Sequence, residues 1–210
     1  MASKLSIGII GAGRLGTAIA RQSLAAGHAV RIANSRGPES LKLMLSVLLP
    51  NAVAAEIGTV IEESDIIVLA IPLNQYMTLD PQLFIDKIII DAMNYWPPTE
   101  GDIPEFMDDN VTSSEYIQQY FKDAHVIKTL NHVAYSELEE HSLPASHPKR
   151  RAIVIVGDWP EAKDYVAQFI DSLGFDAIDL GTLSQGHKFQ PDTELFNARL
   201  TKAEIEHIVT

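Results

Sequence analysis

Residues 5–16 read LSIGIIGAGRLG, an isoleucine-rich apolar run that leads directly into a glycine-rich loop. The apolar run, residues 5–10, predicts a short buried β-strand. Residues 17–26 then predict a helix, which ends at Gly27 in the usual position of a terminating glycine. A second strand is expected at residues 29–34. This order of strand, glycine loop, helix and strand predicts one βαβ unit of about 30 residues.

The three glycines of the loop have the GxGxxG spacing of a dinucleotide-binding turn. In such a turn the first glycine allows the sharp bend, the second lets a pyrophosphate approach the backbone, and the third lets the helix pack closely on the strand. Free N–H groups at the start of the helix then bind the phosphates. The predicted pyrophosphate site comprises Gly11, Ala12, Gly13, Arg14, Leu15 and Gly16.

The end of the second predicted strand indicates which dinucleotide is bound. NAD sites usually place Asp or Glu there to accept from the ribose 2′-hydroxyl, but this sequence has Asn34, Ser35 and Arg36. No carboxylate would repel a 2′-phosphate, the serine hydroxyl can donate to it, and the guanidinium can bind it through two N–H groups. The sequence therefore predicts NADP(H) as cofactor, with a preference of about 10- to 100-fold over NAD(H). Arg14 can add to this preference.

Strands and helices continue to alternate along the chain. Further strands are expected at residues 52–55, 65–71, 87–92, 126–131, 152–156 and 177–180. Further helices are expected at residues 39–49, 59–64, 80–84, 114–121, 160–173 and 201–209. This alternation predicts an α/β fold, a doubly wound, mostly parallel sheet of the Rossmann NAD(P)-binding type with helices on both faces. We expect one domain over residues 1–210, with the dinucleotide-binding core in 1–94 and the remaining sheet, loops and acceptor-side segment in 95–210.

Ligands of such sheets lie at the carboxyl ends of the strands. The residues expected to line the nicotinamide side are Ala70, Ile71, Pro72, Asn94 and Asn131.

Asn94 and Asn131 are candidate amide partners of the cofactor, although each also fits a role as a strand cap. His132 is a candidate acid or base, although a histidine in a polar loop needs no chemical role. Tyr95 and Trp96 begin a loop, residues 95–110, and either stack on a flat ring or pack the loop onto the core. No catalytic residue is assigned by the sequence.

Composition excludes several classes of function. The chain of 210 residues carries 28 Asp and Glu against 16 Lys and Arg, a net charge of −12, which argues against nucleic acid and anionic membranes as partners. Cysteine is absent, which removes disulfides and thiolate chemistry and fits a reducing cytoplasm. The histidines are too scattered to predict a metal site. No apolar run reaches the length of a membrane span, and no leader is expected, so we expect a cytoplasmic protein.

Taken in order, several segments resemble the F-420-dependent NADP oxidoreductase family, which is in turn similar to the reductase domain of the STEAP metalloreductases. They are IGIIGAGRLGTAIA (7–20), GHAVRIANSRGPESL (27–41), DIIVLAIP (65–72), IIIDAMN (88–94), VIKTLN (126–131), and IVIVGD (153–158) with LGFDAIDLGTL (173–183). The resemblance implies that Ser35 and Arg36 hold the 2′-phosphate. It also implies hydride transfer between NADPH and a small acceptor, a deazaflavin (F-420) or a flavin. A homodimer is expected, with residues 177–183 and 189–196 as candidate contacts.

Other functions stay open at this stage. A hydroxyacid or imino acid dehydrogenase would need a second helical domain, for which eight strands in 210 residues leave no room unless a partner chain supplies it. A non-catalytic NADP(H)-binding redox sensor would bind the cofactor without oxidising it in the presence of an acceptor. A Rossmann domain that binds no ligand is disfavoured by the intact glycine loop.

Overall fold

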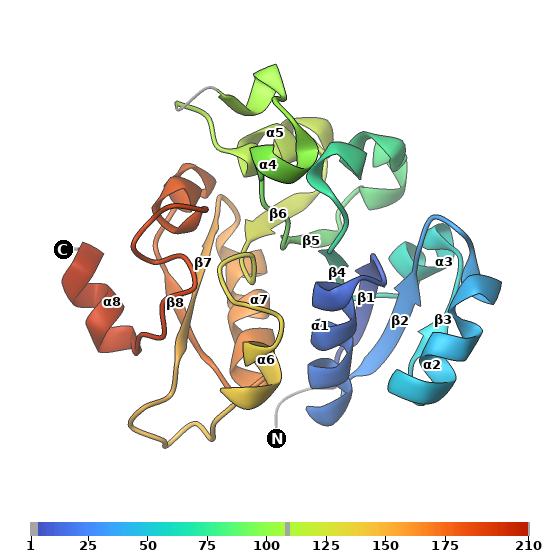
Figure 1. The fold of residues 1–210 in the computed structure, drawn as a ribbon, viewed down its shortest axis with the longest axis horizontal. Helices are drawn as coiled ribbons and strands as arrows, with labels where there is room; N and C mark the ends of the chain where they lie inside the picture. Colours follow the sequence, from blue (N-terminus) through green and yellow to red (C-terminus); the bar gives the residue numbers. More distant parts are fainter. Residues whose placement is uncertain (1–3, 108–109, 210) are drawn as a thin grey trace.

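The sheet is the scaffold on which the predicted site residues are placed. In the computed structural model, which describes residues 4–107 and 110–209, eight strands form one sheet in the order β3-β2-β1-β4-β5-β6-β7-β8 (Figure 1). The strands are β1 (Ser6–Ile10), β2 (Ala29–Ala33), β3 (Val53–Ala54), β4 (Ile66–Leu69), β5 (Ile88–Asp91), β6 (His125–Lys128), β7 (Ala152–Gly157) and β8 (Asp176–Asp179). β7 runs antiparallel to β6, and the other neighbouring pairs are parallel. The predicted doubly wound, mostly parallel sheet is confirmed.

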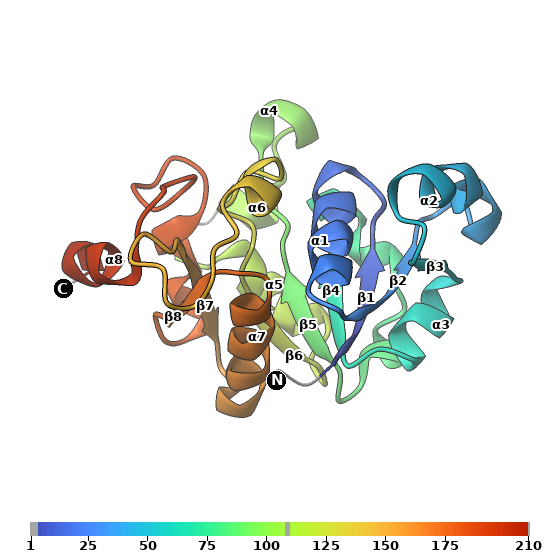
Figure 2. The same ribbon diagram turned by 90° about the horizontal axis from the view of Figure 1, so that it is seen from below.

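Helices lie on both faces of this sheet, as predicted (Figures 1 and 2). The α-helices are α1 (Arg14–Ala25), α2 (Lys42–Leu48), α3 (Ile57–Glu62), α4 (Pro97–Glu100), α5 (Ser113–Tyr120), α6 (Glu137–Glu140), α7 (Pro160–Ser172) and α8 (Lys202–Val209). The 3-10 turns are η1 (Pro38–Leu41), η2 (Leu73–Thr78), η3 (Pro81–Phe84), η4 (Pro104–Met107) and η5 (Leu183–Phe189). None of the helices within the described ranges is long and apolar enough to cross a membrane.

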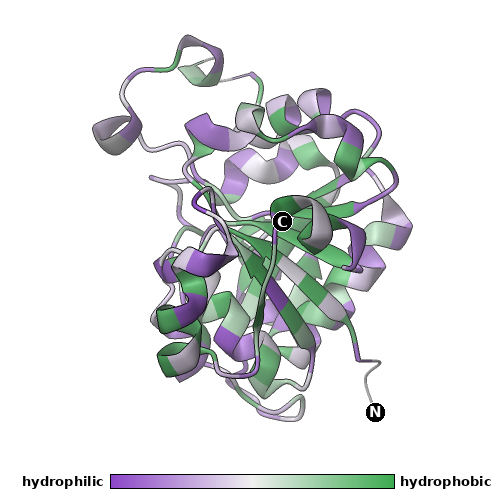
Figure 3. Cartoon of the chain, turned by 90° about the vertical axis from the view of Figure 1, so that its right-hand side faces the viewer, coloured by the Kyte–Doolittle hydropathy of each residue, from purple (hydrophilic) through white to green (hydrophobic). Residues whose placement is uncertain are grey.

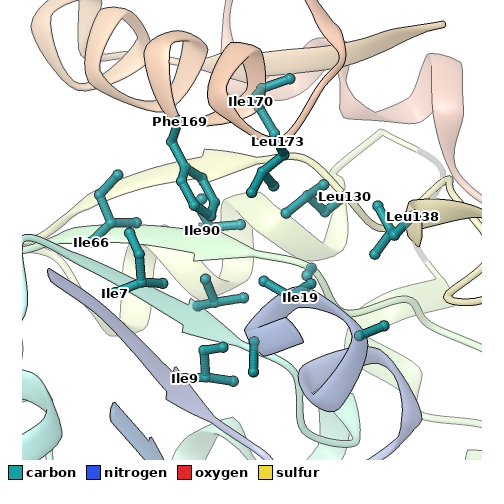
Figure 4. Close-up of a cluster of buried hydrophobic side chains, with 14 of the residues drawn as sticks. Ile7, Ile9, Ile19, Ile66, Ile90, Leu130, Leu138, Phe169, Ile170 and Leu173 are labelled. Carbon is teal, nitrogen blue, oxygen red and sulfur yellow. The ribbon is translucent and has the colours of Figure 1, made fainter. Parts of the chain in front are cut away.

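One apolar core lies between the sheet and helices α1, α2, α6 and α7. Ile7 and Ile9 of β1 and Ile66 of β4 meet Ile19 of α1 and Phe169 of α7 in this core (Figure 4). All five side chains are fully buried. This core therefore fixes α1, and with it the glycine loop, against β1.

A second apolar core covers the opposite face, under α3, α5, α8 and the 3-10 turns. Ile67 of β4 and Ile89 of β5 lie in it with the rings of Phe84, Phe121 and Phe189. The central strands are thus buried on both faces, and Figure 3 shows them mainly hydrophobic while the surrounding helices alternate in hydropathy. Burial on both faces explains why these strands are continuous apolar runs.

The two segments expected to contact a second copy contribute four buried apolar side chains to this second core. Ile178, Leu183, Phe189 and Leu195 are all at most 4% exposed. These side chains therefore offer no apolar dimer face, because the chain itself covers them. The homodimer stays a prediction.

Two predicted helices are wholly or partly 3-10 turns. In η3, Pro81 occupies the first turn and the Asp80 carboxylate accepts from the Gln82 N–H at 3.0 Å, which closes a tight turn instead of an α-helix. The helix expected at residues 39–49 begins as η1 at Pro38 and becomes α2 only after it.

The antiparallel step from β6 to β7 is completed by side chains. Backbone pairing covers only two residue pairs. Beyond them, the Thr129 hydroxyl donates to the Val154 carbonyl at 2.7 Å, and the Val154 N–H donates to His132 Nε2 at 3.1 Å. His132 is therefore a neutral acceptor that takes the place of a backbone carbonyl in the ladder.

This role excludes His132 as an acid or base. Burial, together with the nearby charges of Arg151 and Lys128, lowers the pKa of His132 to about 3. The interpretation of His132 as a catalytic group is thus wrong, because its accepting nitrogen is occupied and its ring is buried.

We predict that the His132 ring stays neutral throughout the range from pH 8 to pH 5. An unfolded histidine protonates near pH 6.5. Between that pH and about 3 only the unfolded state gains this proton, so the free energy of unfolding falls as the pH falls. The contribution is about 1.4 kcal/mol per pH unit. NMR titration of the histidine ring signals, with His132→Gln used for assignment, measures it. A His132 midpoint near the ordinary value would contradict the structural role.

Candidate functional site

The turn between β1 and α1 is built from close backbone contacts. Gly11 has a φ of +117°, which favours glycine, and a Cβ there would lie 2.2 Å from the Ala70 carbonyl oxygen. A Cβ on Gly16 would lie 1.9 Å from the Gly11 carbonyl oxygen. The Gly11 N–H also donates to the Ala33 carbonyl at 2.9 Å. The fold itself therefore requires the first and third glycines of the motif.

The second glycine, Gly13, is not required by the fold. Its φ of −79° and ψ of −170° are open to any residue, and a Cβ here would have no heavy atom of the described chain within 4 Å. Glycine at this position leaves the backbone open to a ligand. Gly13 is also the N-cap of α1, and no side chain among the described residues caps that helix. Its first N–H groups are thus available to an anion, which fits the predicted pyrophosphate.

The other members of the loop have distinct surroundings. Ala12 and Leu15 are partly buried against the core below. Arg14 is exposed, and its guanidinium lies over the Tyr135 ring, 5.7 Å from the centroid, with Nη1 3.4 Å from the tyrosine hydroxyl. Arg14 thus leans toward the segment that follows β6, not toward the turn after β2.

The turn after β2 is braced by Asn34. Its side-chain oxygen accepts from the Arg36 N–H at 2.9 Å and from the Ser40 hydroxyl at 3.1 Å. Within the described chain, no hydrogen bond or ion pair engages the Ser35 hydroxyl or the Arg36 guanidinium, and both residues are exposed. Asn34 therefore shapes the turn, whereas Ser35 and Arg36 are free to bind a 2′-phosphate.

The residues after β4 border an open hollow of about 560 Å³, here called the β4–β5 hollow. Ile71 and Pro72 line it from β4, and Asn94 and Trp96 line it from the segment after β5. Ala70 is bonded to β1, since its N–H donates to the Ile10 carbonyl at 2.9 Å. Of the five residues predicted for the nicotinamide side, Ile71, Pro72 and Asn94 line this hollow. Ala70 and Asn131 do not line it, and Ala70 lies instead against Gly11 of the glycine loop.

Asn94 and Asn131 form a mutual pair. Asn94 Nδ2 donates to the Asn131 carbonyl at 2.7 Å, and Asn131 Nδ2 donates back to Asn94 Oδ1 at 3.0 Å. Asn131 Nδ2 also donates to the Phe189 carbonyl, and the residue is buried. Asn131 therefore positions Asn94, which is the member of the pair on the wall of the hollow.

A buried ion pair joins the ends of β5 and β6, and sequence reasoning missed it. Asp91 and Lys128 stand opposite each other in the strand register, with Nζ 3.2 Å from Oδ2. Asp91 also accepts from the Ser114 hydroxyl at 2.7 Å and from the Met93 N–H at 3.0 Å. Lys128 Nζ donates in addition to the Met93 carbonyl. Burial lowers the pKa of Lys128, while the neighbouring carboxylate of Asp91 opposes that shift.

Lys128 lines a second hollow of about 660 Å³, the β5–β6 hollow. Asn94 and Trp96 belong to both hollows, so the two adjoin. Thr112 and His187 also line the larger one. A signal for this site was present in the sequence, because Asp91 and Lys128 are charged residues at the ends of otherwise apolar strands.

The two aromatic residues at the start of the 95–110 segment have different roles. The Tyr95 ring packs 5.4 Å from Phe106, and its hydroxyl accepts from the Ile103 N–H at 2.8 Å, so it holds the segment on the core. Trp96 is 39% exposed and borders both hollows. The segment itself contains α4 and η4, and residues 108 and 109 lie outside the described part.

Across the described ranges, no group of three or more His, Asp or Glu side chains could hold a metal ion. The hollows instead present amide, hydroxyl, ammonium and aromatic groups. Such groups orient an organic ligand and bind its polar edges.

Comparison with known proteins agrees with this geometry. Residues 6–95 match the family model described as NADP oxidoreductase, coenzyme F420-dependent. The chain is 24% identical over 186 residues to the metalloreductase STEAP3 of Rattus norvegicus, which covers 88% of this chain and 35% of STEAP3. The chain thus spans about a third of the length of that relative.

Two solved structures are similar over almost the whole chain. The hypothetical protein SMa0349 of Sinorhizobium meliloti has a TM-score of 0.80 and 29% identity, covering 95% of this chain and 96% of that one. A candidate F420-dependent NADP-reductase from Arthrobacter sp. FB24 has a TM-score of 0.74 and 25% identity, covering 87% of each chain. The comparisons thus support the resemblance to the F420-dependent NADP oxidoreductase family, whose model matches the part of the chain that holds the glycine loop and the turn after β2.

Proposed function

We propose that the chain reduces a small, flat acceptor at the expense of NADPH. The observation that carries this proposal is the pair of adjoining hollows at the carboxyl ends of β4, β5 and β6, which share Asn94 and Trp96. The β4–β5 hollow lies next to the glycine loop and suits the nicotinamide. The β5–β6 hollow, at about 660 Å³, is large enough for a drug-sized organic molecule.

The chain's own residues would bind and align the two reactants. The open backbone at Gly13 and the start of α1 receive the pyrophosphate, and Ser35 and Arg36 bind the 2′-phosphate. Bound NADPH supplies the hydride. The amide of Asn94, fixed by Asn131, orients groups at the border of the two hollows. Hydride transfer depends mainly on such positioning.

A deazaflavin such as F-420, or a flavin, is the acceptor that we propose. Trp96 offers a partly exposed aromatic face between the hollows, and Lys128 offers a positive charge at the wall. An ammonium can stabilise the negative charge that a conjugated ring gains on taking up a hydride. The family description and the printed name of the Arthrobacter protein support F-420. The alternative, an NADP(H)-binding redox sensor, would bind NADPH without turnover.

We further propose a cytoplasmic homodimer. The absence of cysteine supports a reducing compartment, and two-fold pairing is the commonest assembly of soluble proteins. Sedimentation at micromolar concentration tests the assembly.

The direct test follows NADPH and NADH oxidation with F-420, FMN, FAD and riboflavin as acceptors. Turnover with NADPH and one of these acceptors supports the reductase. Tight NADPH binding without turnover supports the sensor.

We predict that Gly13→Val abolishes binding of both NADPH and NADH while the protein still folds. The new side chain finds open space in the protein and occupies the approach of the pyrophosphate. Calorimetric titration measures binding, and thermal melting checks the fold. Gly58→Val, at another position with open space around its Cβ, is the matched control and should bind normally. Normal NADPH binding by Gly13→Val would place the cofactor elsewhere.

We predict that Arg36→Ala weakens NADPH binding by about 10- to 100-fold, the worth of a charge-assisted hydrogen bond. NADH, which has no 2′-phosphate, should lose little. Lys42→Ala removes an equal charge from the neighbouring α2 and should leave the preference intact, because that ammonium already pairs with Glu39 at 2.6 Å. Equal losses for NADPH and NADH in Arg36→Ala would sink the 2′-phosphate assignment.

We predict that removal of the Lys128 charge slows acceptor reduction by about 10- to 100-fold while NADPH binding persists. Lys128→Met alone leaves the buried Asp91 carboxylate unpaired, so the double variant Lys128→Met, Asp91→Asn is the better test. Steady-state turnover and NADPH affinity are measured together. Wild-type turnover in a folded double variant would show that the pair serves the fold alone.

A further inference from the structure

A third hollow, of about 200 Å³, lies at the start of β7. Three cationic residues line it, Lys149, Arg151 and Arg199, together with Glu140 and His141. Its lining residues are different from those of the two hollows above. Its role is therefore separate from NADP(H) and acceptor binding.

Arg151 is the central group of this hollow. It is 4% exposed, and its Nη1 donates to the Glu137 carboxylate at 2.6 Å and lies 3.4 Å from His141 Nδ1. Nε and Nη2 have no hydrogen-bond partner within the described chain. Buried donors of a charged group are costly to leave unpaired, so two unused N–H groups on one guanidinium point to a ligand.

The preceding residue, Arg150, shows that the fold can satisfy a buried guanidinium at this point of the chain. Arg150 is 3% exposed. Its Nε donates to the Leu143 carbonyl, Nη1 to the carboxylates of Asp171 and Asp176, and Nη2 to the Asp171 carbonyl, all within 3.0 Å. The two neighbours are equally buried, and in the described structure only Arg151 keeps an unused pair of donors.

Charge around the hollow favours an anion. The Glu137 carboxylate forms ion pairs with two guanidiniums: Oε2 accepts from Arg151 and Oε1 accepts from Arg199. Lys149 is exposed, and no ion pair within the described ranges engages its ammonium. Three cations thus surround the hollow against the carboxylates of Glu137 and Glu140, in a chain whose net charge is −12.

We propose that this hollow binds a small oxyanion, a phosphate or carboxylate group, with Arg151 and Lys149 as its donors. Nε and Nη2 lie on one edge of the planar guanidinium, and their two parallel N–H bonds match two oxygens of such a group. A hollow of about 200 Å³ admits a small ligand and is below the range for nucleotides. The ligand is therefore a small anion, and the site does not depend on the proposed reductase activity.

Calorimetric titration of the full chain with inorganic phosphate, at constant ionic strength set by sodium chloride, tests the proposal. Malonate, titrated in parallel, distinguishes a carboxylate ligand from a phosphate. The wild-type protein should bind one of the two, and Lys149→Ala should weaken that binding by about tenfold. Lys122→Ala removes an equal charge elsewhere on the surface, where the ammonium faces Asp123, and should bind like wild type.

Phosphate could also bind at the turn after β2, so Arg36→Ala is titrated as well. Retained anion binding in Arg36→Ala, with loss in Lys149→Ala, supports the proposal. Loss in Arg36→Ala with normal binding in Lys149→Ala would overturn it, as would no binding of either anion to wild type. Arg151→Lys keeps the charge but removes the fork, and it should lose the anion while NADPH binding is unchanged. Lys149 and Arg36 are exposed, so those variants decide the matter even if Arg151→Lys does not fold.

Discussion

The contact of backbone with backbone at Gly11, Gly16 and Ala70 is the constraint on which the rest of the site depends. A single methyl group at either glycine would meet a carbonyl oxygen at about 2 Å. This contact presses the start of α1 onto the ends of β1 and β4. It fixes the direction of the helix axis, and the apolar core beneath holds the helix there. Gly13 lies at the tip of the loop, where no packing contact requires glycine and the missing side chain leaves room for a ligand.

At the carboxyl ends of β5 and β6, polar side chains hold the strands and the segments that follow them in place. Asp91 and Lys128 tie β5 to β6, and Asn94 and Asn131 tie the segments that follow these strands. Both pairs are buried or half-buried and hydrogen-bonded on several sides, so they hold one arrangement of the hollow walls. Fixed hollow walls suit the proposed hydride transfer, which depends on the distance and orientation of the two reactants.

Features that depend on neighbouring residues could be predicted from the sequence, whereas features that depend on distant contacts could not. The glycine loop, Ser35 and Arg36 could be predicted as binding residues because the roles proposed for them follow from neighbours within a few residues. Asn34 was grouped with Ser35 and Arg36 at the cofactor site, and in the structure its side chain braces its own turn. The Asp91–Lys128 pair spans 37 residues and needs the strand register to be seen. The role of His132 stayed open in the sequence because its partner, the Val154 N–H, lies in the antiparallel strand β7, 22 residues further along the chain.

Trp96, which borders both hollows, gives the molecule an optical property. The chain has two tryptophans. The ring of the other, Trp159, lies 4.3 Å from the His125 ring. His125 begins β6, so Trp159 is at the opposite end of the strands from Trp96. One indole therefore lies where ligands would meet and the other lies away from them. Binding of a ligand in the proposed site would therefore change the fluorescence of Trp96 and leave that of Trp159 unchanged.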